Sequence, residues 1–290
     1  GIVKTESRTV NFRPLCGIFN QSKYLPLKYL GPLTLEFELA DVNDAIITPG
    51  SSTVFTAANT TSNWQISNCC IKCDICTLDN ALNNSYTEHL LSGKALPIEY
   101  STYISQQSSI ASGGNTQQFS VQVIRAVSRL QRAFVTFYDT AFAGTPFYKP
   151  AITFHHPMAI VGNGGRYNPA QDLTLQLQLG AKLLPEYPST NIPEQFYMLK
   201  KALNLPDYHQ HSIGIRPQNY RKDKFIFCVS FEKIPDAEWS GINTKAGQIL
   251  MVNGKAPKMP NTQSIGTTMY TLLEAQNILE IRDVGCTIFD

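Results

Sequence analysis

The sequence predicts an all-β protein folded as a β-sandwich, with one or two short helices. Apolar and polar residues alternate with a period of two in several segments, which is the pattern of half-buried strands. Gly, Pro and Asn turns separate these segments, as is typical of sandwiches. With 290 residues, 43% of them hydrophobic and 16% charged, the chain has enough apolar side chains for one large β domain or two ordinary ones.

The stretch from residue 119 to residue 138 is the centre of this prediction. Phe119, Val121 and Val123 fall on one face of an expected strand, so that face must pack on a sheet. Residues 134–138 combine aromatic and β-branched side chains and predict a second strand. The remaining strands are expected to join this pair.

The part of the chain before this pair predicts strands, one long loop and a short helix. Residues 10–12 favour a strand, and residues 33–39 alternate cleanly between apolar and polar side chains. Residues 40–62 are rich in small and polar residues around a central Pro-Gly, which indicates a loop where a boundary between two units could lie. A long strand over residues 64–78 and a short helix or loop over residues 81–91 are expected next.

Further strands are expected on both sides of the central pair. Pro97 favours an edge strand or a strand start over residues 94–107, because proline cannot donate a ladder hydrogen bond. Residues 173–179 alternate Leu with Thr and Gln, which predicts another strand. Shorter apolar runs predict the remaining strands, which cover residues 225–231, 248–252 and 278–289.

One helix is well marked, over residues 193–203. Pro193 suits the first helical turn, and Glu194 complements the positive end of the helix dipole. Apolar residues recur at helical spacing, and basic residues lie near the far end, namely Phe196, Leu199, Leu203, Lys200 and Lys201. We expect this helix to lie across one end of the sheets.

Composition excludes several classes of function. Because 24 Lys and Arg oppose 22 Asp and Glu, the net charge is near +2, which provides no strong field for nucleic acid or an anionic membrane. No run of about 18 apolar residues occurs, and the first ten residues lack the apolar core of a signal peptide. We therefore expect no sequence-specific nucleic-acid binding, no transmembrane segment and no leader.

Seven cysteines are expected to be reduced thiols, because their number is odd and the chain is too long to need disulfides. Four of them, Cys69, Cys70, Cys73 and Cys76, contain two overlapping C-x-x-C spacings of the kind that binds zinc. In a strand, however, their side chains would point to opposite faces. We therefore expect buried structural cysteines, with zinc binding and redox chemistry as alternatives.

No catalytic or cofactor motif stands out. The sequence lacks a nucleophile elbow, a Walker loop, a zincin motif and a dinucleotide fingerprint. His209 and His211 could share a strand face, but loop positions on the surface suit them better, and His155 and His156 would point to opposite faces. The glycines at 162–165 predict a turn. We expect no enzyme activity, no cofactor and no metal.

The basic middle of the central stretch is a candidate contact surface. Arg125, Arg129 and Arg132 could contact a partner chain or a polyanion, or could form a solvated edge with local ion pairs.

Beyond these local patterns, the order of several longer passages resembles that of a known family. They are FRPLCGIFNQSKYLPLKYLGPLTLEFEL (12–39), FSVQVIRAVSRLQRAFVTFYD (119–139), LGAKLLPEYPSTNIPEQFYMLKKAL (179–203), FIFCVSFEKIPDAEWSGINTKAG (225–247) and ILEIRDVGCTIFD (278–290). In this order they resemble the later part of the double jelly-roll major capsid proteins of icosahedral double-stranded DNA viruses, such as Polinton-like viruses, virophages and large DNA viruses. These are packing and turn patterns, so their order carries the resemblance.

The resemblance implies a jelly-roll fold and a structural role in a virion capsid assembled in the host cytoplasm or nucleus. Residues 1–45 would be the terminal strands of a first jelly roll, and residues 46–290 would form the second. The missing N-terminal half would then exist as a separate chain or segment. A single enlarged jelly roll is the alternative.

The expected assembly is a homotrimer of pseudo-hexameric outline, which contacts neighbouring capsomers, penton proteins and minor capsid proteins. Apolar and aromatic area would provide the contacts between subunits. Candidate residues lie in an aromatic passage at Phe142, Phe147 and Tyr148.

Two other classes of function remain open. A minor capsid protein or a receptor- or carbohydrate-binding module would need a groove of exposed aromatic residues, for which Trp64 and Trp239 are the only tryptophans. A jelly-roll enzyme of the cupin type would need a His/Glu metal cluster on adjacent strands, and the sequence shows none.

Overall fold

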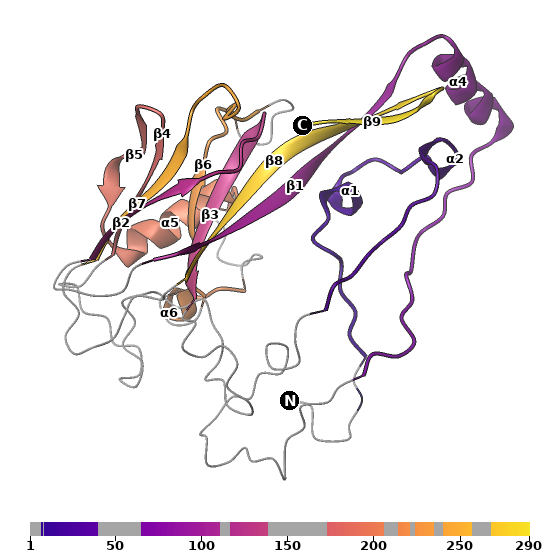
Figure 1. The fold of residues 1–290 in the computed structure, drawn as a ribbon. Coiled ribbons are helices and arrows are strands. Elements are labelled where there is room, and N and C mark those ends of the chain that lie inside the picture. The colour runs from indigo at the N-terminus through magenta and orange to yellow at the C-terminus, as the bar shows by residue number, and fades with distance from the viewer. Residues whose placement is uncertain are drawn as a thin grey trace.

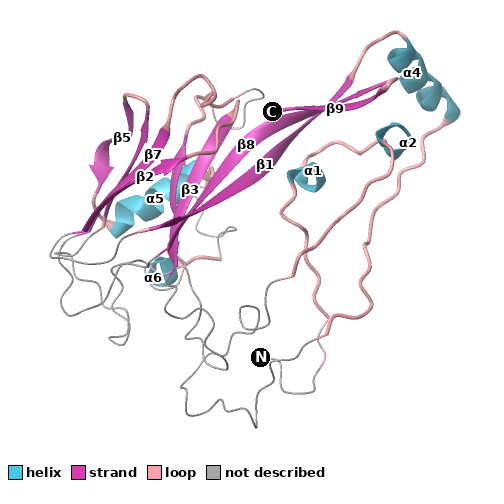
Figure 2. Ribbon diagram, in the orientation of Figure 1, coloured by secondary structure: helices cyan, strands magenta, loops and turns pink. Residues whose placement is uncertain are grey.

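The computed structural model describes most of the chain outside its long loops. The described residues are 7, 9–39, 65–110, 117–138, 173–205, 214–220, 224–234, 240–256 and 268–290. Strands and their connections dominate them, and α-helix is confined to a few segments (Figure 2).

Two antiparallel sheets form the sandwich (Figure 1). The first sheet has the order β1-β8-β3-β6, and β9 pairs with β8 beyond this path. Its strands are β1 (Leu96–Ser109), β3 (Leu130–Tyr138), β6 (Phe227–Ser230), β8 (Thr268–Arg282) and β9 (Gly285–Phe289). The second sheet has the order β2-β7-β4-β5, with β2 (Gln117–Val123), β4 (Thr174–Leu179), β5 (Lys182–Ser189) and β7 (Leu250–Ala256).

The pairing of the strands is that of a jelly roll. β1 pairs with β8, β2 with β7, β3 with β6 and β4 with β5, and all four pairs are antiparallel. The chain is therefore one long hairpin that turns back between β4 and β5 and rolls into two facing sheets. The predicted all-β sandwich is confirmed, and its eight paired strands lie between Leu96 and Arg282.

Most predicted strands form close to the expected positions. β1 is an edge strand that contains Pro97, as predicted, and β4, β6 and β7 cover the expected apolar runs. The expected C-terminal strand is the end of β8 followed by β9. The central stretch forms β2 and β3, which lie in opposite sheets.

Three predicted strands do not form. Residues 10–12, 33–39 and 65–78 have neither helix nor strand structure, and many of their apolar side chains are exposed. The predicted alternation is present in residues 33–39, but a strand also needs a neighbouring strand for its backbone hydrogen bonds. None of the described segments pairs with these three.

Two helices span several turns, and their ends follow their sequences. In α4 (Asn80–Leu91) the Asp79 carboxylate accepts a hydrogen bond of 2.7 Å from the backbone N–H of Leu82. In α5 (Ile192–Ala202) the Asn191 side chain caps the backbone N–H of Glu194 at 2.8 Å. This confirms the predicted helix, which packs against β6. The remaining helices are single turns, namely α1 (Gly17–Asn20), α2 (Leu27–Leu30) and α6 (Pro217–Tyr220).

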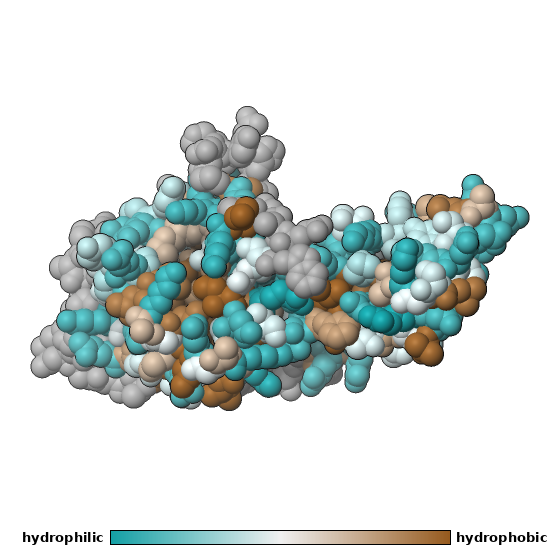
Figure 3. Space-filling view, turned by 90° about the horizontal axis from the view of Figure 1, so that it is seen from above, coloured by the Kyte–Doolittle hydropathy of each residue, from teal (hydrophilic) through white to brown (hydrophobic). Residues whose placement is uncertain are grey.

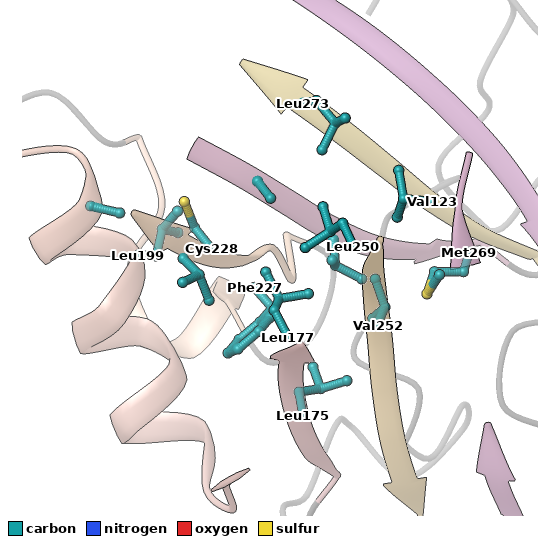
Figure 4. Close-up of a cluster of buried hydrophobic side chains, with 14 of the residues drawn as sticks. Val123, Leu175, Leu177, Leu199, Phe227, Cys228, Leu250, Val252, Met269 and Leu273 are labelled. Carbon is teal, nitrogen blue, oxygen red and sulfur yellow. The ribbon is translucent and has the colours of Figure 1, made fainter. Parts of the chain in front are cut away.

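The main hydrophobic core fills the space between the two sheets (Figure 4). Leu175 and Leu177 of β4 meet Phe227 of β6 there, and Leu199 of α5 lies beside Cys228. Val123 is buried, and Phe119 and Val121 pack against the core, as the alternation predicts. Other members are Ala133, Val135, Phe137, Leu250, Val252, Met269 and Leu273.

A side-chain amide joins the two sheets at one edge of the sandwich. Gln106 of β1 donates a hydrogen bond of 2.9 Å to the backbone carbonyl of Gln122 and accepts one of 2.9 Å from the backbone N–H of Ile124. Both partners belong to the end of β2 or to the residue that follows it. Gln106 therefore holds the edge strands β1 and β2 of the two sheets together.

Candidate functional site

An arm projects from the sandwich (Figure 1). β1 and β8 extend past the other strands towards α4, and β9 pairs with β8 along this extension. We call the segments Leu96–Ser101, Asn277–Arg282 and β9 the arm sheet.

One face of the arm sheet forms a second hydrophobic core. Ile98 of β1 and Leu279 of β8 are opposite each other in the strand register, and both are buried. This is the same face of β8 that buries Leu273 and Ala275 in the sandwich, because residues two apart in a strand share a face. In the arm, the covering side chains come from the N-terminal segment instead of a second sheet, and they are Ile18, Leu25, Tyr29 and Leu30.

Polar contacts also fix the N-terminal segment to the arm. The Tyr29 hydroxyl lies 2.9 Å from the Thr87 hydroxyl of α4, and Lys28 Nζ donates to Asn83 Oδ1 at 3.1 Å. Gly17 of α1 lies so close to β1 that a Cβ there would be 1.6 Å from the Ser101 carbonyl oxygen. Sequence reasoning missed this contact. The glycine at the start of the helical turn was the one signal that could have indicated it.

Many large apolar side chains outside the sandwich are exposed. In the N-terminal segment Phe12, Leu15 and Tyr24 are each about two-thirds exposed or more. At the tip and the edge of the arm Val284 is 97% exposed and Ile288 is 59% exposed. In the space-filling view, hydrophobic patches lie over both the sandwich and the arm (Figure 3). Exposed apolar area of this extent is typical of surfaces that bind another protein.

The predicted arginines have different environments. Arg125 is exposed. Arg129 is half-buried, and its Nε donates to the backbone carbonyl of Gln276 at 3.3 Å. Arg132 lies inside a polar cluster, and its guanidinium binds side chains of the same chain. The other predicted contact residues, Phe142, Phe147 and Tyr148, lie outside the described residues.

The polar cluster joins four elements of the first sheet. Arg132 of β3 pairs with Glu274 of β8 at 3.2 Å and with Glu232, just after β6, at 3.3 Å. The two carboxylate side chains are only 6% and 3% exposed. The Tyr103 hydroxyl of β1 donates to Glu274 at 3.2 Å. Sequence reasoning could not find this cluster, because both carboxylates lie a hundred or more residues from Arg132 along the chain.

Burial and charge in this region shift several pKa values. Burial lowers the pKa of the Arg132 guanidinium, but the charges of Glu274 and Glu232 more than offset this, so the pKa is raised. Burial, followed by the charge of Glu274, raises the pKa of Tyr103 to about 12. Burial also raises the pKa of the Cys228 thiol, which is therefore held in its unreactive protonated form. These groups form a structural cluster.

The structure describes the clustered cysteines but not the candidate histidines. Cys69, Cys70, Cys73 and Cys76 are exposed, so the prediction that they are buried is wrong. Among the described residues, no strand pairs with this segment. The four candidate histidines, at positions 155, 156, 209 and 211, and the glycines at 162–165 lie outside the described residues.

The described residues form neither a metal-binding cluster nor a membrane-spanning helix. Among the parts of the chain that the structure describes, no three His, Cys, Asp or Glu side chains lie close enough together to hold a metal ion. None of the described helices is both long and apolar enough to span a bilayer.

Comparison with known proteins gives matches among solved structures alone. No family model and no curated protein sequence matches the chain. The crystal structure of PBCV-1 VP54 fitted into a reconstruction of the virophage Sputnik has a TM-score of 0.47 at 13% identity, and the match covers 73% of this chain and 55% of that chain.

Two further structures come from the same viruses. The PBCV-1 capsid model has a TM-score of 0.42 at 12% identity, with 73% of this chain and 55% of that chain covered. The Sputnik virophage structure has a TM-score of 0.39 at 11% identity, with 67% and 39% covered. The chain thus spans about half the length of the first two proteins.

Proposed function

We propose that this chain is a structural subunit of an icosahedral viral capsid and forms part of a double jelly-roll major capsid protein. The order of its sequence passages, which resembles that family over most of the chain, supports this role. The complete jelly-roll order of its eight paired strands is the fold that such a subunit requires.

The observation that carries the proposal is the large apolar surface outside the sandwich. Many large apolar side chains of the described N-terminal segment and of β9 are exposed, and burial against other subunits would remove them from water. The near-neutral net charge of +2 provides little repulsion against close packing of identical chains. Both features suit a protein that assembles with copies of itself.

In the proposed assembly three copies form a capsomer with a pseudo-hexameric outline. Residues 1–45 belong to a first jelly roll that another segment or chain completes, and residues 46–290 contain the second jelly roll. Arg125 and Arg129, together with the aromatic passage at Phe142, Phe147 and Tyr148, contribute to contacts between subunits. The capsomer contacts its neighbours, penton proteins and minor capsid proteins in the virion.

The mass of the native particle tests this proposal. Light scattering or mass photometry of the purified protein should give three copies of the 32.3 kDa chain, together with any companion segment that intact-mass spectrometry identifies. Negative-stain images should show threefold particles. A 32.3 kDa monomer at micromolar concentration, without threefold particles, would contradict the proposal.

A matched pair of variants shows whether the apolar surface makes the contacts. Ile288→Asp places a charge on the exposed edge strand β9 and should dissociate the trimer. Lys182→Asp also changes an exposed strand residue, but it lies in the second sheet far along the chain from β9, and it should leave the trimer intact. Equal masses for both variants and the wild type would exclude β9 from the interface.

No described feature favours the receptor- or carbohydrate-binding alternative. Trp64 and Trp239, the two tryptophans that a glycan groove could use, lie outside the described residues. Binding to a glycan array by the monomeric chain would support that alternative.

A further inference from the structure

The described N-terminal segment, residues 9–39, packs on the arm through its two single turns, α1 and α2 (Figure 1). Its side chains that cover the arm core are Ile18, Leu25, Tyr29 and Leu30. Among the described residues, the main core between the two sheets contains no side chain from this segment. Residues 65–79, which lead into α4, contribute a side chain to neither core. Contacts with the arm, rather than burial in the main core, therefore fix the position of the N-terminal segment.

Polar contacts join the same segment to three elements of the arm. Lys23 Nζ donates a hydrogen bond of 3.3 Å to the backbone carbonyl of Pro97 in β1. The Cys286 thiol of β9 faces the carbonyl oxygens of Tyr29 and Leu30, at 3.5 and 3.8 Å. Two side chains of α2 form hydrogen bonds with side chains of α4. Residues 17–30 thus bind a surface that β1, β9 and α4 build together.

Hydrogen bonds within the segment order its turns. Asn20 Nδ2 donates to the backbone carbonyls of Pro14 and Cys16 around α1, both at 3.1 Å. Gly31, with a left-handed φ of 77°, ends α2. A segment that forms its own turns loses less conformational entropy when it binds. This order favours binding of the segment to the arm even as a separate peptide.

Apolar side chains on both sides of the docked turns are exposed. Phe12 and Leu15, before α1, are 66% and 68% exposed, and Phe37, after α2, is 55% exposed. Residues 33–39 have the alternation of a strand, but none of the described segments pairs with them. These flanks therefore suit a partner that supplies a sheet, whereas residues 17–30 already contact the arm.

We propose that the arm is the site where the first jelly roll docks on the second, with residues 17–30 as the docking element. This inference rests on the proposed function, which assigns residues 1–45 to the first unit. The docked turns cover Ile98, Leu279 and Ile281, which would otherwise be exposed to water on one face of the arm sheet. The exposed flanks then join the sheet of the first unit. Because these contacts are noncovalent, docking does not need a continuous chain between residue 39 and residue 65.

A cleavable form of the full chain tests the docking. A protease recognition sequence is inserted between Ser51 and Ser52, and the purified protein is cut and passed over a sizing column at micromolar concentration. We expect the N-terminal fragment to elute with the remainder of the chain. Native mass spectrometry of that peak should show both pieces in one complex.

Two variants in the same helical turn show whether the arm core holds the fragment. Leu30→Asp places a charge in the arm core and should weaken retention of the fragment more than about tenfold, because it removes a large apolar side chain and buries a carboxylate. Leu27→Asp is the matched control, since Leu27 is 59% exposed, and its fragment should be retained as in the wild type. Circular dichroism melts of both uncut variants should match the wild type, because neither side chain enters the main core.

Two results would each overturn the docking site, namely release of the wild-type fragment after cleavage and equal retention of the two variant fragments. The wild-type result needs no variant, so it decides the question even if Leu30→Asp does not fold. The oligomer mass tests the capsid role separately. Release of the fragment from an intact trimer refutes docking alone, whereas retention on a monomeric chain supports docking and refutes the trimer.

Discussion

At the scale of single residues, Arg132 has the most demanding environment. Its guanidinium bridges two carboxylates that are almost completely buried. A buried ion pair gains little net stability over well-packed apolar residues, because desolvation offsets the attraction between the charges. Removal of one member is costly, however, since the remaining charge stays buried without its partner.

We predict that Arg132→Leu strongly destabilises the sandwich. The variant leaves Glu232 and Glu274 close together without a cation, and loss of one member of a buried pair costs about 3–5 kcal/mol. The free energy of unfolding from urea titration measures the change. Arg125→Leu is the control, because its exposed side chain should change stability by less than about 0.5 kcal/mol. Equal losses in both variants would contradict the role of the cluster.

The pKa of Tyr103 predicts a loss of stability in alkaline solution. Burial and Glu274 raise this pKa from 10.0 to about 12, so the folded state favours the protonated hydroxyl. As the pH rises, the unfolded chain loses this proton first. The contribution of Tyr103 to the free energy of unfolding is therefore fully present below pH 10 and is lost as the pH rises towards 12. Urea midpoints measured across this range should fall, and Tyr103→Phe should reduce the slope. If Tyr103→Phe leaves the slope of urea midpoint against pH unchanged, groups other than Tyr103 cause the alkaline loss of stability.

At the scale of elements, the N-terminal segment replaces a second sheet over the arm. β8 is 15 residues long, and one continuous face of it serves both cores. Over the sandwich that face packs on strands, whereas over the arm it packs on the single turns α1 and α2. Gly17 lies so close to the backbone of Ser101 that only a glycine fits there.

We predict that Gly17→Ala detaches the N-terminal segment from the arm. The added Cβ would lie 1.6 Å from the Ser101 carbonyl oxygen, so the helical turn must move away from β1. Amide hydrogen exchange should show lost protection in residues 17–30 and retained protection in the sandwich strands. Leu27→Ala is the control, because this side chain in α2 is 59% exposed. Normal protection of residues 17–30 in Gly17→Ala would show that the backbone adapts.

At the scale of the whole molecule, the sandwich and the arm have separate cores. Deletion of residues 278–290 removes Leu279 and Ile281, two of the three fully buried members of the arm core, together with all of β9. We predict that this deletion abolishes the proposed trimer. The sandwich pairs of β8 up to Ala275 remain, so β-sheet circular dichroism should persist.

Size-exclusion chromatography with light scattering measures the oligomeric mass of the truncated chain. Gly214→Ala is a suitable control, because no atom of the described residues beyond its chain neighbours lies within 4 Å of the added Cβ, and it should elute as the wild-type protein does. A normal trimer from the truncated chain would place the subunit interface elsewhere.

Sequence patterns located most elements but could not assign their partners. The Leu alternation in residues 173–179 predicts β4, and the cap and charge pattern around Pro193 predicts α5. Alternation identifies which face of a strand is buried, but it does not identify the neighbouring strand. For this reason residues 33–39 were predicted as a strand although none of the described segments pairs with them, and β2 and β3 lie in opposite sheets.

The amino-acid sequence is enough to specify the fold class, the main strands and helix α5, because these depend on local periodicity and on the chemistry of helix ends. Tertiary structure alone decided that the hairpin rolls into a jelly roll, that Arg132 meets Glu232 and Glu274, and that the four clustered thiols are exposed. These features depend on contacts between residues far apart along the chain, and their geometry exists only once the order of the strands is fixed.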